Sequence, residues 1–200
     1  MAIDVIVISD SLLKHCRTPG HANIHAISGL TTESLIGKIR RNCLDKYGTS
    51  VNWNRYYLCI LHVGTNDVGK GKGDYVVDNL IEVVREIRTH RPNLDIAISG
   101  ILPRPKDHKD TSDILIKINR DLKDWCDSKD YLHFHPSYKS FIRHKRPIED
   151  QNLFAQDRLH LGDFGINRMC QIIKVIVTRW RNLSLSFNYQ NYLSDGIVYI

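Results

Sequence analysis

Three polar residues of this chain, Ser11, Asp157 and His160, have types and spacings that suit nucleophilic catalysis. Asp157 precedes His160 by three positions, so its carboxylate can lie beside Nδ1 of the imidazole within a single turn. That contact fixes the tautomer in which Nε2 accepts a proton, and a serine that gives up its proton becomes a nucleophile. Each feature also has a simpler structural interpretation, because serine often caps a helix and Asp and His fall three apart by chance.

A second stretch could stabilise negative charge on a carbonyl oxygen under attack. Gly64-Thr65-Asn66-Asp67 directly follows the apolar run 56–63, and Asn66 offers a neutral side-chain donor of the kind that suits an oxyanion hole. The alternative for Asn66 is a turn-forming role, which is usual for Asn close to Gly.

The elements that must position these residues alternate between strands and helices. Ser11 follows a near-continuous run of Val and Ile, which indicates a strand buried on both faces. The alternation predicts an α/β protein with a mostly parallel sheet, in which ligands bind at the carboxyl ends of the strands. We expect strands over residues 3–9, 23–28, 56–63, 94–101 and 131–135, and helices over 31–48, 74–90, 111–129 and 164–180.

Two further motifs are incomplete. Gly64 to Lys70 has the spacing of a phosphate-binding loop, but Gly71 stands where such a loop needs Ser or Thr to hold magnesium. His133 and His135 share one face of a predicted strand, yet no third ligand lies within reach in the sequence. We therefore interpret the first as a solvated loop and the second as strand-end histidines, and we predict no metal site.

Taken in chain order, these features resemble the SGNH hydrolase superfamily, also called GDSL-type esterases and lipases. The most specific segments are HVGTND at 62–67 and DRLHL at 157–161. The resemblance covers residues 1–182 and implies a three-layer α/β/α, flavodoxin-like fold. Within the superfamily, the motif sequences are most similar to those of esterase domains in first-reading-frame proteins of non-LTR retrotransposons. We therefore expect this chain to be one domain of a longer protein. Residues 183–200, which show little periodicity, are expected to form an extra strand or a linker.

The resemblance implies roles for the first three residues. Ser11 would be the nucleophile, His160 the general base, and Asp157 the group that orients His160. One position departs from the family pattern, because the usual Gly-Asp-Ser reads Ser9-Asp10-Ser11 here. The change adds a side chain near the turn and keeps the nucleophile.

The implied oxyanion hole combines the backbone N–H groups of Ser11 and Gly29 with the side chain of Asn66, and Asp10 and Gly64 support the motifs around it. The predicted reaction is hydrolysis of carboxylic esters through an acyl-enzyme. The substrates would be acyl or acetyl esters, and lipid esters are among them. Such a reaction needs no metal or organic cofactor.

The composition fits one soluble domain. The 200 residues are 42% hydrophobic and 25% charged, and no apolar run is long enough to span a bilayer. The five cysteines are an odd number without a C-x-x-C pair, so we expect reduced thiols. No signal peptide is recognisable, and we expect a cytoplasmic protein.

The formal charge of +6 predicts attraction to anions. The basic stretch 136–150 precedes the His160 motif, and it contains Lys139, Arg143, Lys145 and Arg146. Either this stretch borders the site and favours anionic substrates or surfaces, or it is a solvated loop. The charge also supports an alternative function, a non-catalytic SGNH-like module that binds RNA or anionic lipid. The sequence leaves the oligomeric state open.

Overall fold

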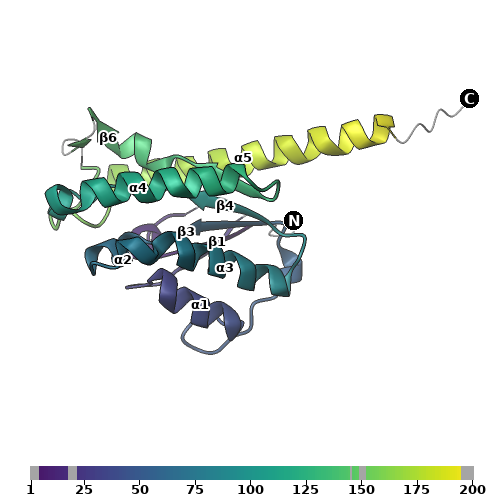
Figure 1. Cartoon of the computed structure of the whole chain (residues 1–200), viewed down its shortest axis with the longest axis horizontal. Coiled ribbons are helices and arrows are strands. Elements are labelled where there is room, and N and C mark those ends of the chain that lie inside the picture. The colour runs from purple at the N-terminus through teal and green to yellow at the C-terminus, as the bar shows by residue number, and fades with distance from the viewer. Residues whose placement is uncertain (1–4, 18–21, 145, 149–151, 195–200) are drawn as a thin grey trace, which may run out of the picture.

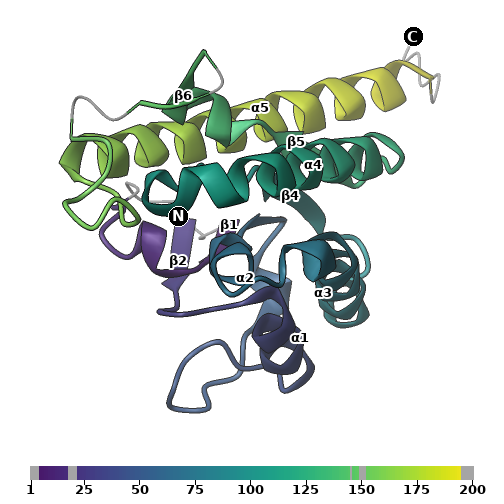
Figure 2. The ribbon, with the colours of Figure 1, turned by 60° about the vertical axis from the view of Figure 1, so that its left-hand side comes forward.

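A parallel sheet forms the centre of the molecule, and helices cover both of its faces (Figure 1, Figure 2). The computed structural model describes residues 5–17, 22–144, 146–148 and 152–194. The strand order β2-β1-β3-β4-β5 is that of flavodoxin-like folds, so the predicted three-layer α/β/α fold is confirmed. The strands of this sheet are β1 (Val5–Ser9), β2 (Ala22–Ala26), β3 (Leu58–His62), β4 (Asp95–Ser99) and β5 (Leu132–His135).

Helices connect the strands, and the first of them begins with the predicted threonine cap. Thr31 Oγ1 accepts a hydrogen bond from the Ser34 backbone, while Ser34 Oγ accepts one from the Thr31 backbone. This reciprocal arrangement satisfies two of the donors that a helix start leaves open. The helices are α1 (Thr32–Arg40), α2 (Thr65–Gly69), α3 (Val76–His90), α4 (His108–Asp127) and α5 (Asp163–Ser194).

Shorter elements complete the described part of the chain. Five single turns of 3-10 helix are η1 (Ser11–Leu13), η2 (Trp53–Arg55), η3 (Gly73–Tyr75), η4 (Pro105–Asp107) and η5 (Ser137–Phe141). A two-stranded hairpin is formed by β6 (Ile142–Arg143) and β7 (Arg146–Pro147). The described residues of the predicted basic loop form η5 and this hairpin, while Lys145 lies outside the described residues.

Two hydrophobic clusters fill the spaces above and below the sheet. Ile6 and Ile8 of β1 belong to the cluster that α1, α3 and α4 cover, whereas Val5 and Val7 belong to the cluster that α5 covers. Side chains alternate along a strand, so burial on both faces requires apolar residues at every position. This is why the first strand reads as a continuous Val and Ile run.

The structure differs from the sequence expectation at several element ends. Helix α1 stops at Arg40 rather than near Gly48, although Leu44 is still buried, because the chain turns at Asn42 in a left-handed conformation (φ 51°). The apolar spacing continues past the helix because the following loop also packs on the core. The segment after β3, where a turn was the alternative role considered for Asn66, is the short helix α2.

The last helix is longer than predicted and runs to Ser194, so the boundary expected at residue 182 falls inside α5. Residues 183–194 are therefore helical and do not form a strand. Figure 1 shows this end of α5 projecting beyond the sheet and the other helices. No helix within the described ranges is long and apolar enough to cross a membrane.

The cysteine prediction was wrong for one pair. Cys16, just after η1, and Cys170, in α5, form a disulfide with their Cα atoms 5.7 Å apart. They are 154 positions apart in sequence, and the fold brings them together because η1 and α5 pack in the same cluster. Cys43, Cys59 and Cys126 are free thiols, as expected.

Candidate active site

The predicted site residues meet at the carboxyl ends of the first three strands. Ser11 begins η1 after β1, and Asn66 lies in α2 after β3. They line one cavity of about 280 Å³, which is also lined by Asp10, Leu12, Ser28, Gly29, Thr65, Leu159 and His160. The loop before α5 brings the histidine to the same place from almost 150 residues along the chain.

The side chains of Ser11, His160 and Asp157 are connected by hydrogen bonds. Ser11 Oγ lies 3.2 Å from His160 Nε2, and His160 Nδ1 lies 2.5 Å from Asp157 Oδ2. The other carboxylate oxygen of Asp157 accepts hydrogen bonds from the backbone N–H groups of Leu159 and His160 at 3.0 and 2.9 Å. The hydrogen bond from His160 lowers the pKa of Asp157 to about 2, so this carboxylate is ionised at neutral pH.

Asp10, rather than Ser11, caps η1. Its Oδ1 accepts a hydrogen bond from the Leu12 backbone at 3.0 Å, which leaves the Ser11 hydroxyl available to His160. Burial raises the pKa of Asp10 to about 7, and Oδ2 has no hydrogen-bond partner among the described residues. Ser9, which replaces the glycine of the family pattern, is buried and donates from Oγ to the Asp10 carbonyl at 3.0 Å. The added side chain is thus accommodated with a partner of its own.

The two other predicted oxyanion donors border the same cavity. Gly29 has a left-handed backbone (φ 71°), which favours glycine although a Cβ there would meet nothing within 4 Å. Asn66 Nδ2 donates to the Leu30 carbonyl at 3.0 Å. A side-chain amide has two N–H groups, so the second one remains for a ligand. The bond to Leu30 fixes the direction in which that donor points.

Gly64 lies at the start of α2 with a φ of 130°. A Cβ at this position would lie 2.5 Å from Cδ1 of Ile101 and 3.2 Å from Cγ1 of Val76. Both backbone conformation and packing therefore require glycine where the chain turns from β3 into the helix that carries Asn66.

Two residues that hold this edge together were missed by sequence reasoning. The buried Asp67 accepts hydrogen bonds from the backbone and the hydroxyl of Thr32, the latter at 2.7 Å, and so ties α2 to the start of α1. Arg104 is also buried, and it donates to the Thr65 carbonyl at 2.9 Å while pairing with Asp107 at 2.6 Å. The only signal for Asp67 is its place in the GTND segment, and Arg104 gave none because it lies in a polar, Pro-rich loop.

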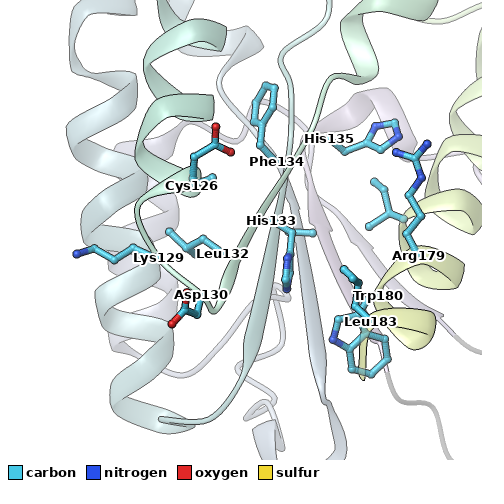
Figure 3. A pocket seen from close by; sticks show the side chains of 13 residues that line it. Cys126, Lys129, Asp130, Leu132, His133, Phe134, His135, Arg179, Trp180 and Leu183 are labelled. Carbon is cyan, nitrogen blue, oxygen red and sulfur yellow. The ribbon is translucent and has the colours of Figure 1, made fainter. Parts of the chain in front are cut away.

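The histidines of β5 take no part in this site. His133 and His135 line a separate cavity of about 400 Å³ between α4, β5 and α5 (Figure 3), and its lining residues are all different from those around Ser11. His135 Nδ1 lies 3.1 Å from the hydroxyl of Ser137. No group of three His, Cys, Asp or Glu side chains suited to a metal ion occurs in the described part of the chain.

A flavodoxin-like sheet with a Ser–His–Asp constellation at its carboxyl edge is an arrangement of serine hydrolases. The sequence profile of the GDSL-like lipase/acylhydrolase family matches residues 8–166, and the chain belongs to this family. No curated relative matches the chain by sequence.

Solved structures that share the fold are distant in sequence. A member of the lipolytic protein G-D-S-L family from Veillonella parvula is 18% identical with a TM-score of 0.70, over 89% of this chain and 100% of that one. A family 3 carbohydrate esterase from Clostridium thermocellum is 15% identical with a TM-score of 0.62, over 90% and 98%. The OSK domain of Drosophila Oskar is 16% identical with a TM-score of 0.62, over 88% of each chain. At these identities the likeness concerns the fold.

Proposed function

We propose that the protein is a serine esterase that hydrolyses carboxylic esters through an acyl-enzyme. The observation that carries the proposal is the hydrogen-bonded series from Ser11 Oγ through His160 to Asp157, with distances of 3.2 and 2.5 Å. In this series the nucleophile, the base and the orienting carboxylate stand in the order that acyl transfer requires.

In the first half-reaction, Ser11 Oγ bonds to the acyl carbon while its proton passes to His160 Nε2. The ester C–O bond then breaks, and the departing alcohol takes the proton from His160. In the second half-reaction, water gives a proton to Nε2 and attacks the acyl carbon, and Ser11 leaves with that proton. Asp157 stays ionised throughout and holds Nδ1 in its protonated form.

The negative charge of each tetrahedral intermediate would be held by Asn66 and by the backbone N–H groups of Ser11 and Gly29. All three residues line the cavity beside the nucleophile. Loss of one such donor typically lowers turnover roughly 10²–10³-fold. A cavity of about 280 Å³ suits an acetyl or short acyl group, so longer acyl chains would have to extend outside it.

A second candidate function is a non-catalytic module that binds RNA or anionic lipid, and the net charge of +6 favours it. Binding driven by phosphate contacts weakens steeply as salt rises, whereas hydrolysis of a neutral ester does not.

We also propose a mobile-element origin for the domain, on the basis of the amino-acid sequences of segments 61–67 and 157–165.

The decisive test is hydrolysis of a p-nitrophenyl ester series of increasing acyl length by the whole chain. We expect activity on short esters that is lost in Ser11→Ala and kept in Ser128→Ala, which removes a hydroxyl at the far end of α4. Equal rates in Ser11→Ala and the unaltered protein would reject the esterase proposal.

A further inference from the structure

A second, larger cavity adjoins the site on the other side of the Asp157–His160 turn. It has a volume of about 820 Å³ and lies between η4, the first turn of α4 and β7. Its cationic side chains come from separate segments of the chain, and they are Lys106, Lys109, Arg146 and Arg158. We refer to this cavity as the basic groove.

Positive charge dominates in the basic groove. Its two carboxylates are Asp107 and Asp110, against four cationic side chains. The Asp107 carboxylate is already engaged, because the buried Arg104 holds it with hydrogen bonds of 2.6 and 2.8 Å that lower its pKa. Among the described residues, Lys106, Lys109 and Arg146 make no ion pair, whereas Arg158 has an interaction of its own. Three cations therefore stand against Asp110, the one lining carboxylate that Arg104 does not hold.

Polar groups of the protein itself point to an anionic ligand. The groove contains the first turn of the 20-residue helix α4, where backbone N–H groups and the helix dipole favour negative charge. An oxyanion bound there would meet the start of this helix together with the cationic side chains.

The groove and the cavity beside Ser11 are lined by consecutive residues of one short segment. Arg158 lines the groove, whereas Leu159 and His160 line the cavity of the nucleophile. Two Cα-to-Cα steps separate Arg158 from His160, which is at most about 7.6 Å. The Lys106 backbone donates to the Arg158 carbonyl at 2.9 Å, so the wall shared by the two cavities is tied to η4.

We propose that the basic groove binds a phosphate group of the substrate, so that the preferred substrate is an acyl ester that also carries phosphate. The proposal rests on the proposed function, since the acyl group must react at Ser11. A phosphate presents several oxygens, which can meet lysine ammonium groups and an arginine fork from different directions at once. Binding energy from this non-reacting group would orient the ester bond towards the nucleophile. The phosphate is not transferred, and the reaction stays ester hydrolysis.

The test compares two soluble esters with the same acyl group, monobutyryl glycerol and monobutyryl glycerol phosphate, using the whole chain. We expect kcat/KM to be at least about tenfold higher for the phosphate ester, as contacts to charged groups typically provide. Arg146→Ala and Lys109→Ala should reduce this ratio several-fold. The matched controls Arg120→Ala and Lys117→Ala remove exposed cations further along α4 and should keep the ratio of the unaltered protein.

Inorganic phosphate serves as the probe of the groove itself. It should compete with the phosphate ester in the unaltered protein and compete more weakly in Arg146→Ala. A preference that appears only when the ester is presented in vesicles, without competition by inorganic phosphate, would mean a membrane surface and would overturn the proposal.

Other results would also overturn it. These are a kcat/KM ratio near one in the unaltered protein, or a ratio that falls equally in the two control variants. The protein could also show no preference for the phosphate ester, while a single-stranded RNA inhibits hydrolysis of both esters and Arg146→Ala relieves this inhibition. That result would identify a nucleic-acid surface instead. Ser11-dependent hydrolysis of the neutral ester separates this failure from failure of the esterase proposal, which would abolish turnover of both esters.

Discussion

Under the proposed mechanism, the contact between Asp157 and His160 makes one carboxylate important for turnover. Asp157→Asn keeps the size of the side chain, but its amide N–H₂ faces Nδ1 and favours the wrong imidazole tautomer. Such a change lowers kcat about 10⁴-fold in a Ser–His–Asp site, and we expect a loss of that order here. The measurement is kcat on a short p-nitrophenyl ester.

The matched control for this variant is Asp113→Asn, the same substitution at an exposed position of α4. It should keep the kcat of the unaltered protein. Asp113→Asn should also keep the urea unfolding midpoint, whereas Asp157→Asn should lower it slightly, because the half-exposed Asp157 carboxylate holds its turn with three hydrogen bonds. If Asp157→Asn retains more than about a tenth of the activity, His160 does not depend on this carboxylate.

At the scale of single residues, the family resemblance assigned Ser11, Asn66, Asp157 and His160 to one site, and each of them follows or precedes a recognisable element. Sequence reasoning could not find Asp67 or Arg104, because their partners, Thr32 and the Thr65 carbonyl, are more than 30 positions away. A carboxylate in a turn and an arginine in a polar loop have the same sequence signature whether they are solvated or buried. Only the folded arrangement distinguishes the two cases.

At the scale of elements, the turn from β3 into α2 depends on Gly64. Gly64→Ala combines a backbone strain at φ 130° with a Cβ 2.5 Å from Ile101. Each effect typically costs about 1–3 kcal/mol, so we expect the free energy of unfolding to fall by roughly 2–6 kcal/mol. The measurement is urea denaturation followed by circular dichroism. Activity should fall as well, since α2 carries Asn66.

Gly71→Ala separates the two contributions in Gly64→Ala. Gly71 has a φ of 70° but nothing within 4 Å of the added Cβ, so only backbone strain, about 1 kcal/mol, should appear. Equal losses of stability in the two variants would show that the contact with Ile101 relaxes without cost.

The class and order of the larger elements were predictable from sequence, whereas several of their ends were not. Buried strands and amphipathic helices have distinct apolar periods, which the segments at β3 and α3 display clearly. Helix α1 was predicted too long because Leu44 in the next loop continues its apolar spacing. Helix α5 was predicted too short because the part after residue 182 has no apolar period that would distinguish it from a loop.

At the scale of the whole molecule, the disulfide between Cys16 and Cys170 joins the segment that follows Ser11 to the last helix. A link across 154 positions restricts the unfolded chain, and the chain-entropy model assigns about 5 kcal/mol to a loop of this length. We expect a reductant to lower the thermal midpoint of the unaltered protein. In Cys170→Ser the midpoint should already be lower and should not respond to reductant, whereas Cys126→Ser should respond like the unaltered protein.

This pairing marks the limit of what the sequence could provide. The strand order came from the family resemblance, because alternation of strands and helices alone is compatible with several orders. No comparable pattern exists for two cysteines at opposite ends of the chain, one after β1 and one in α5. Their proximity is a consequence of the sheet order and of the face that α5 covers.

The pH dependence of stability is a property of the whole molecule that Asp10 should influence strongly. Burial raises its pKa from 3.8 to about 7, so between these values the native state holds a proton that the unfolded state has lost. The contribution of Asp10 to the free energy of unfolding is therefore greatest below about pH 4 and is lost as the pH rises towards 7. A difference of about three pKa units corresponds to on the order of 4 kcal/mol.

His62 acts in the opposite direction, because burial lowers its pKa from 6.5 to about 4 and stability from it rises over that range. Asp10→Asn isolates the carboxyl, since the amide oxygen can still accept the hydrogen bond from Leu12 while the titration is removed. The free energy of unfolding of the unaltered protein minus that of Asp10→Asn, measured by urea denaturation, should therefore decrease from pH 4 to pH 8. A difference that stays constant over this range would mean that Asp10 is already ionised in the folded protein, with its buried Oδ2 paired in solution.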